Sequence, residues 1–382
     1  MEEVNDPSVF EKDNEVSMYD SETNYSVKNP HDNGGHIAYE VKGKDKQGAW
    51  EAKRRYNEFF LLHDILQKRF PGIPIPCIPP KQAFGNKDNT FVQDRTFYLQ
   101  RFLRKLTRFD FIIDSQEFQL FARPNGLNVE KALAKLMPMS TMQTYERVKA
   151  VTNTDDQKFD LMQRERFAND VTQYMFFAKN VEPLLRKIKS DLSSYLMAKH
   201  RTLGATKDYA AFITRYEDLN LTHYADMNNR ELVFNNPENK ALQESMVTTG
   251  SALKNPYIDL YHWVKGELYD IEAVRDSIKV RAEAMENLKK LEAKKNSTQN
   301  DLEAVSAGKT TVGTLFKNSK DTSSMANSIE STDREIASTR LLIDLLTIYL
   351  GEKVIPTFKK EKLDLYHRIL KQFTVIEINN SH

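Results

Sequence analysis

A long series of apolar residues, spaced alternately four and three positions apart, constrains the fold of this chain more than any other feature. Positions with this spacing lie on one side of an α-helix, and their unbroken alternation keeps that side continuous along a supercoiled rod. Such an apolar seam must be buried, so the rod needs a partner helix. The seam consists of Phe167, Val171, Tyr174, Ala178, Val181, Leu185, Ile188, Leu192 and Tyr195.

Two further apolar series, each repeating every seven residues, predict two more long helices in the same half of the chain. Pro237, Pro256 and Pro356 interrupt the helical runs, and each should bend a helix or end a segment, because proline removes a backbone hydrogen bond. A polar stretch at residues 296–328 lies between the second and third helices and indicates a mobile tip. We therefore predict an all-α region of three long, kinked helices over residues 155–382. The two series are Val264, Ile271, Ile278 and Met285, and Ile329, Ile336, Ile343 and Leu350.

The first part of the chain has a different pattern. Residues 1–22 are acidic and polar, a composition typical of a flexible tail. Short alternating runs separated by glycine-bearing turns then predict an antiparallel meander. Apolar residues at helical spacing follow, interrupted by a proline-rich stretch at residues 71–80. We predict an α+β domain with a small antiparallel sheet over residues 23–124 and a linker over residues 125–154.

The composition disfavours several classes of function. Lys and Arg total 55 and Asp and Glu total 54, so the formal net charge of +1 argues against an extended nucleic-acid groove. The histidines lack paired metal-ligand spacing, and the single cysteine, Cys77, has no histidine close in sequence to activate it. Gly308-Lys309-Thr310 looks like part of a phosphate-binding loop, but Glu303 stands where the first glycine belongs. We therefore predict no metal, no cofactor and no enzymatic activity.

Any membrane attachment of this chain should be peripheral. The sequence has neither a basic-then-apolar leader nor a long uncharged apolar run of the kind that crosses a bilayer. We expect a cytoplasmic protein that meets membranes through headgroup recognition, a basic surface or a shallow amphipathic helix.

Three separate segments of the α+β domain carry residues suited to a phosphorylated ring. Arg55 and Tyr56 end the third predicted strand, Lys81 closes the proline-rich stretch, and Arg95 opens the next helix. Arginine binds phosphate in a bidentate manner, and an aromatic ring can lie against a sugar-like headgroup. The strand end, the loop and the helix start can converge on one pocket. Two alternatives stay open: the arginines are solvated surface charges, or Tyr56 belongs to the core.

The same segments, in the same order, resemble the PX (phox homology) domain. The matching motifs are Arg-Arg-Tyr-Asn-Glu-Phe at 54–59, Ile-Pro-Pro-Lys at 78–81 and Arg-x-x-x-Leu-x-x-Phe-Leu at 95–103. This resemblance implies binding of phosphatidylinositol 3-phosphate. Arg54 stands one strand position before the pocket residue, so its side chain should point to the opposite face.

The PX resemblance also implies a role for each candidate residue. Arg55 would hold the 3-phosphate, and Tyr56 would stack on the inositol ring. Lys81 would meet the 1-phosphate near the bilayer, and Arg95 would bind the ring hydroxyls. Asn57 stands where the family often has a small polar residue, so it would border the site.

Three long helices after a PX domain resemble the BAR domains of the sorting nexins. The segments that carry this resemblance are Asn-Pro-Tyr at 255–257, Trp-Val-Lys-Gly-Glu at 263–267 and Ile-Pro-Thr-Phe-Lys-Lys-Glu-Lys at 355–362. The chain is thus identified as a member of the PX-BAR sorting nexins, with similarity to the subgroup that acts in endosomal recycling and selective autophagy.

This second resemblance implies a peripheral protein of endosomal membranes that forms an antiparallel dimer with a curved, basic surface. The partner would be a second copy or another sorting nexin, and cargo or adaptor proteins would bind as well. Such a dimer would sense or stabilise tubular membrane during cargo sorting. The alternatives are an adaptor or tether whose rod does not reshape membrane, and an enzyme subunit or phospholipase with a PX targeting module, which the heptads disfavour.

Two further sets of residues are candidates for membrane contact. The linker has one apolar face, formed by Val129, Leu133, Leu136 and Met137, which would either wedge into a bilayer or pack against a neighbouring domain. A set of lysines near the predicted tip would each contribute about 1 kcal/mol at an anionic surface, or else would be ordinary solvated helix ends. These are Lys289, Lys290, Lys294, Lys295, Lys317 and Lys320.

Overall fold

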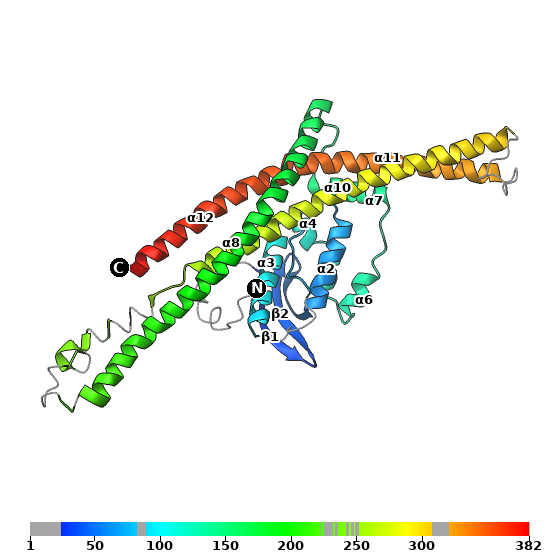
Figure 1. The fold of residues 1–382 in the computed structure, drawn as a ribbon. Helices are drawn as coiled ribbons and strands as arrows, with labels where there is room; N and C mark the ends of the chain where they lie inside the picture. Colours follow the sequence, from blue (N-terminus) through cyan, green and yellow to red (C-terminus); the bar gives the residue numbers. More distant parts are fainter. Residues whose placement is uncertain are drawn as a thin grey trace.

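An α+β domain lies against the middle of an array of long helices (Figure 1). The computed structural model describes residues 24–81, 89–221, 223–224, 232–233, 236–241, 244–245, 248, 252–307 and 321–381. The predicted N-terminal tail and two of the candidate lysines, Lys317 and Lys320, lie outside these residues. None of the described helices is long and apolar enough to span a bilayer.

The predicted antiparallel meander is confirmed as a three-stranded sheet with the strand order β1-β2-β3. Side chains alternate between the two faces of a strand, and Tyr39 and Val41, two positions apart in β2, are both fully buried. Arg55 pairs with Ala38 at the end of β3 away from the tight turn between β2 and β3. The strands are β1 (Ser26–Asn33), β2 (His36–Asp45) and β3 (Gly48–Arg55).

Helices pack on the sheet through a core rich in aromatic rings. The ring centroids of Phe59 and Phe121, which come from two different helices, are 5.0 Å apart. Prolines in the described residues 71–81, after the first helix, keep this segment free of helix, because each lacks a backbone donor. The helices are α2 (Tyr56–Arg69), α3 (Asn89–Leu106), α4 (Asp110–Ile113) and α5 (Gln116–Ala122).

The linker contains two helices, of which the sequence predicted one. The amphipathic stretch forms α6 (Val129–Ala134), and α7 (Thr141–Thr152) follows it. The sequence signal for α7 is a capping box, in which the Ser140 hydroxyl accepts from the backbone N–H of Gln143 and the Gln143 side chain accepts from the Ser140 N–H. Contacts of α7 with the third long helix then hold it in place.

The three predicted long helices are present, and the third is interrupted by a π-helical turn (Figure 1). The seam predicted from the alternating spacing packs against the second long helix, and its residues Val171, Tyr174 and Ala178 are buried. The long helices are α8 (Leu161–Tyr216), α10 (Tyr257–Ser306), and α11 (Asp321–Tyr349) joined to α12 (Ile355–Ser381) through η3 (Leu350–Val354). Short turns of helix, η1 (Glu217–Leu221) and η2 (Pro237–Asn239), lie between α8 and α10.

The prolines singled out in the sequence mark segment starts. Pro237 begins η2, Pro256 precedes α10, and Pro356 lies in the first turn of α12, directly after η3. A proline next to a π-helical turn is a common cause of a bend, which Figure 1 shows between α11 and α12. Pro183 lies inside α8 without ending it.

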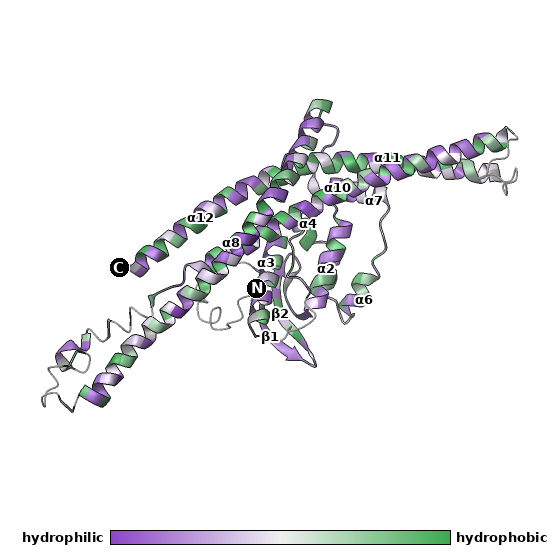
Figure 2. Cartoon of the chain, in the orientation of Figure 1, coloured by the Kyte–Doolittle hydropathy of each residue, from purple (hydrophilic) through white to green (hydrophobic). Residues whose placement is uncertain are grey.

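The prediction of a polar tip at residues 296–328 was wrong at both ends. Helix α10 continues to Ser306, and α11 begins at Asp321. The Thr298 hydroxyl in this stretch donates to the Lys294 carbonyl oxygen of its own helix over 3.0 Å. Figure 2 shows the resulting mixture of hydrophilic and hydrophobic residues along α10. Polar composition therefore did not prevent helix formation here.

Helix α8 and the turn η3 come into close contact at Gly351. A methyl group at this position would lie 2.8 Å from the Cα atom of Phe167, a distance that packed carbon atoms do not tolerate. Gly204, a glycine inside α8, has open space on the side where a methyl group would stand.

We expect Gly351→Ala to lower the free energy of unfolding by about 1–3 kcal/mol, because overpacking forces the two segments apart. Gly204→Ala should raise it by about 0.5–1 kcal/mol, because alanine loses less conformational entropy in a helix. Chemical denaturation followed by circular dichroism measures both values. Equal effects of the two substitutions would contradict the close packing at Gly351.

Candidate functional site

The buried guanidinium group of Arg95 is the centre of the candidate site. Arg95 is 5% exposed, and its guanidinium carbon lies 4.1 Å from the ring centroid of Tyr56 and 4.2 Å from that of Phe91. Its Nε atom has no hydrogen-bond partner among the described residues. Burial raises the pKa of the nearby Tyr39, and the Arg95 charge opposes that rise. Helix α3 thus holds a positive charge in the interior, between two aromatic rings.

Tyr56 is a core residue that also forms a wall of the site. It begins α2, and its hydroxyl donates to the Pro79 carbonyl oxygen over 2.6 Å, which ties the helix to the proline-rich segment. Burial raises the pKa of this hydroxyl. The sequence left open that Tyr56 belongs to the core, and the structure places it there, with Arg95 over its ring.

Neighbouring arginines at the end of β3 point in opposite directions, as strand geometry predicts. Arg54 is buried and donates through Nε to the Phe121 carbonyl oxygen over 2.7 Å. The side chain of Arg55 is 39% exposed, and its Nη2 atom lies 3.5 Å from Oε1 of Glu130. The backbone N–H of Arg55 donates to the Glu58 carboxylate over 2.6 Å, which fixes the start of α2.

Lys81 and Asn57 are both exposed. The Lys81 ammonium group lies 5.6 Å from the ring centroid of Phe60, whose ring is in turn 6.4 Å from that of Tyr56. Asn57 follows Tyr56 in the first turn of α2.

These contacts bring part of the predicted pocket together. Tyr56 and Arg95 touch directly, and Lys81 is linked to them through Phe60. The Arg55 side chain is at the strand end, where its contact is with Glu130. Cationic groups around an aromatic wall suit a phosphorylated ring. Across the part of the chain that the structure describes, no cluster of His, Cys, Asp and Glu could hold a metal ion.

The candidate lysines on α10 differ in their surroundings. Lys289, Lys290 and Lys294 are exposed. Lys295 is partly buried and pairs with Asp333 of α11 over 2.6 Å. An ion pair between two helices is a structural role, so Lys295 is less available to an external anion than the other three.

The linker residues pack against the α+β domain. Val129 and Leu133 are buried in its core, and Leu136 packs against that core. Met137 is 78% exposed. Of the two alternatives from the sequence, the structure shows the packed one, because a wedge into a bilayer would require Val129 and Leu133 to leave a core that already covers them.

By sequence, the matches to known proteins cover about a quarter of the chain or less. A PX domain family model matches residues 43–125. The chain is 33% identical over 108 residues to sorting nexin-4 of Saccharomyces cerevisiae, which is 24% of this chain and 26% of that protein. It is 31% identical over 98 residues to sorting nexin-8 of Mus musculus, which is 26% of this chain and 21% of that protein. It is 39% identical over 69 residues to the vacuolar protein sorting-associated protein vps5 of Schizosaccharomyces pombe, 18% of this chain and 12% of that protein.

The similarity of the folds extends over nearly the whole chain. The cryo-EM structure of the SNX-BAR Mvp1 tetramer matches with a TM-score of 0.62 and 16% identity, over 94% of this chain and 97% of that one. The chain has the architecture of a PX-BAR sorting nexin. At this identity the structural match concerns the fold, and the matches to the curated relatives span between 7% and 26% of their own length.

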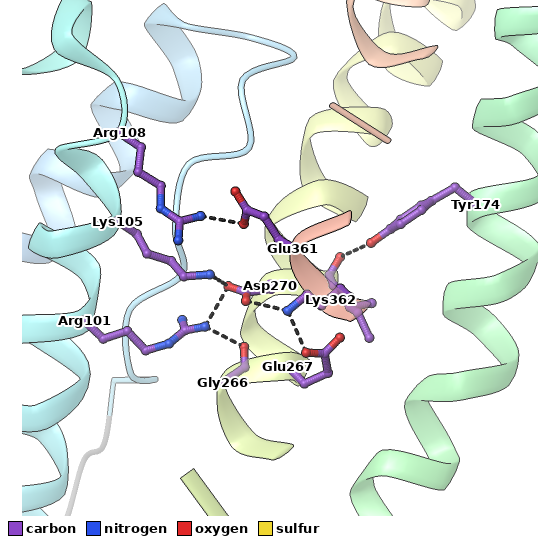
Figure 3. Close-up of polar contacts among 10 residues, drawn as sticks. Arg101, Lys105, Arg108, Tyr174, Gly266, Glu267, Asp270, Glu361 and Lys362 are labelled. Atoms are coloured by element: carbon purple, nitrogen blue, oxygen red, sulfur yellow. Dashed lines mark hydrogen bonds and ion pairs between the residues drawn. The ribbon is translucent and has the colours of Figure 1, made fainter. Parts of the chain in front are cut away.

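The PX domain is joined to the long helices by a buried ionic cluster centred on Asp270 (Figure 3). From α3, Arg101 donates to the Asp270 carboxylate over 2.8 Å, and Lys105 donates to the same oxygen. From α12, Lys362 donates to Asp270 and to Glu267, over 2.6 Å in each case. Three elements that are distant in sequence therefore meet at one carboxylate.

The charges of this cluster change one another's pKa values. Burial alone would raise the pKa of Asp270, but the charges of Arg101, Lys105 and Lys362 outweigh it and hold that pKa well below its usual range. Burial, with Arg101 adding to it, lowers the pKa of Lys105 to about 7. Asp270 is therefore the ionised centre of the junction.

Sequence reasoning missed this junction, although part of its signal was visible. Glu267 and Lys362 are the last residues of two segments that carried the BAR resemblance, and they form an ion pair. Gly266, in the first of these segments, leaves room for Arg101, which donates to its carbonyl oxygen over 2.9 Å. The acidic partner of Arg101 and Lys105 could not be read from helical spacing.

We expect Asp270→Asn to lower the free energy of unfolding by about 3–5 kcal/mol, because it leaves buried cations without their counter-charge. Glu361→Gln is the matched control, since its pair with Arg108 is largely exposed and should contribute at most about 1 kcal/mol. Urea denaturation of both variants measures the difference. A loss below 1 kcal/mol for Asp270→Asn would contradict a structural role for the cluster.

Proposed function

We propose that this chain is a peripheral membrane protein that binds phosphatidylinositol 3-phosphate through its PX domain and sorts cargo on endosomal membrane. The observation that carries the proposal is the buried Arg95 guanidinium group between Tyr56 and Phe91. A buried polar group is costly without a partner, and the Arg95 Nε atom has none among the described residues. A negatively charged or hydroxyl-rich ligand would supply the missing partner.

Each proposed pocket role follows the PX family pattern. Arg55 holds the 3-phosphate, because its guanidinium group is half-exposed at the strand end. Arg95 bonds ring hydroxyls beside the wall formed by Tyr56, Lys81 meets the 1-phosphate, and Asn57 borders the opening. We propose the domain limits 23–124 for the lipid-binding domain and 155–382 for the helical one.

Removing the proposed phosphate ligand should abolish selective lipid binding. We expect Arg55→Ala to weaken binding to liposomes that contain phosphatidylinositol 3-phosphate at least tenfold, because a charge-assisted bidentate contact is lost. Lys46→Ala is the control, since it removes one exposed charge from the opposite end of β3. Liposome flotation across phosphoinositides measures both. Equal binding by the wild type and Arg55→Ala would reject the pocket assignment.

We also propose that the helical domain forms a dimer with a second copy or another sorting nexin. Large apolar side chains are exposed on α8 and α12, where Figure 2 shows hydrophobic segments along both helices. Burying an apolar face is the main source of free energy in obligate association. These residues include Phe176, Phe177 and Leu184 on α8 and Leu363, Leu370 and Ile378 on α12.

The proposed dimer presents two PX pockets to one membrane, which raises the apparent affinity by the effective concentration of the second site. Lys289, Lys290 and Lys294, exposed on α10, are proposed to add attraction to anionic lipid. A dimer that bends membrane would sort cargo into tubules, as in endosomal recycling and autophagy. A dimer whose rod does not reshape membrane would serve as an adaptor or tether.

A charge placed in the proposed dimer face should separate the subunits. We expect the purified chain to have twice the monomer mass of 44.3 kDa, and Phe176→Glu to shift it to the monomer, because an interfacial charge would be desolvated without a partner. Sizing with light scattering measures this, with Met142→Glu on α7 as the control for an exposed apolar residue elsewhere. A wild-type mass of 44.3 kDa would contradict self-association.

Liposome binding without tubulation by the wild-type dimer would favour the adaptor alternative.

A further inference from the structure

Glu130 of the linker helix α6 places a negative charge beside the proposed phosphate ligand. Its Oε1 atom lies 3.5 Å from Nη2 of Arg55, and both side chains are 39% exposed. The two residues are 75 positions apart in sequence, so folding alone brings them together. The contact is therefore at the rim of the proposed pocket, open to solvent and to a ligand.

Helix α6 belongs to the linker, after the residues that the family model matches, which end at 125, yet it packs on the PX domain as a fixed element. Val129 and Leu133, on either side of Glu130 along the chain, are buried in the PX core. The Asn128 side chain caps the helix by accepting from the Lys131 N–H over 2.9 Å. Beyond the helix, Arg69 donates to the Met137 carbonyl oxygen over 2.7 Å. Glu130 is thus held near Arg55 by packing on both sides.

We infer that Glu130 sets the headgroup charge that the pocket accepts, favouring a single phosphate on the inositol ring over two. This inference rests on the proposed function, because it concerns the phosphoinositide held by Arg55. A phosphate bound to the Arg55 guanidinium group lies close to the Glu130 carboxylate, and like charges repel over such distances. The ligand also competes with Glu130 for the Arg55 guanidinium group.

Repulsion from Glu130 grows with the charge of the headgroup. A second phosphate on the same six-membered ring stays within a Debye length of the carboxylate, about 8–10 Å in ordinary buffers, so salt does not screen it fully. Without Glu130, the cations Arg55, Lys81 and Arg95 would favour the more highly charged ring. With Glu130, each added phosphate on the ring contributes less to the binding free energy. Glu130 therefore selects headgroups of lower charge, in addition to any contribution to the fold.

The test compares Glu130→Gln with wild type by flotation of liposomes that contain either phosphatidylinositol 3-phosphate or phosphatidylinositol 3,4-bisphosphate. We expect Glu130→Gln to tighten binding to the monophosphate by about two- to fivefold, the range of an exposed ion pair, and binding to the bisphosphate by more. Glu51→Gln is the control, because Glu51 is an exposed carboxylate on β3 that pairs with Lys42 and should leave the ratio of the two affinities unchanged.

The outcomes separate this inference from the proposed function. Binding to the 3-phosphate lipid that Arg55→Ala abolishes, with an affinity ratio that Glu130→Gln leaves unchanged, would overturn the role of Glu130 alone. Weaker binding by Glu130→Gln would overturn it too, and would make Glu130 a residue that positions Arg55. Failure of the wild type to bind either lipid would overturn both proposals. A ratio shifted toward the bisphosphate in Glu130→Gln, and unchanged in Glu51→Gln, supports the inference.

Discussion

The Asp270 carboxylate is buried where the two halves of this molecule meet, so the free-energy cost of its desolvation constrains how they are joined. An isolated carboxylate in a protein interior is strongly disfavoured, and here Arg101 and Lys362 offset that cost from opposite sides. One cation belongs to the PX domain and the other to the last helix. A slightly shifted PX domain would leave charges buried and unpaired, so the junction favours one arrangement over its neighbours.

A fixed junction gives the proposed lipid pocket a defined direction relative to the long helices. Arg95 and Arg101 are six positions apart on α3, so the helix that carries the pocket arginine also carries the junction arginine. Lys265 of α10 adds a second tie, because it pairs with Asp94, next to Arg95, over 2.7 Å. Under the proposed function, the lipid pocket and the membrane-contacting helices then approach the membrane in one fixed relative orientation.

The features that the sequence predicted well are those with a local period. The meander, the long helices and the opposite directions of Arg54 and Arg55 all follow from spacings of a few residues. The misses have a different physical origin. Helix α7 and the helical ends of the tip depend on packing against other helices, which overrides a weak local propensity. For this reason, the polar composition of residues 296–306 wrongly predicted a tip where α10 continues.

The candidate site divides in the same way. The motif order located Tyr56, Lys81 and Arg95, and the structure brings these three together through neighbouring rings. Phe91 is four positions before Arg95 on α3, so helical spacing alone makes them neighbours. The contact of Arg95 with Tyr56 could not be predicted, because it depends on how α3 packs against α2. The same holds for Glu130, whose pairing with Arg55 depends on how the linker folds back over the PX core.

The order in which the chain is synthesised gives the junction a further consequence. Arg108 meets Glu361 across 253 positions, and Lys362 completes the Asp270 cluster from the same turn of α12. The PX domain therefore emerges from the ribosome long before its docking partners, with its basic α3 surface still hydrated. Such a domain can fold early as a separate unit, whereas its docking on the long helices must wait until α12 has been synthesised. A product truncated before α12 would leave that basic surface without Glu361 beside Arg108.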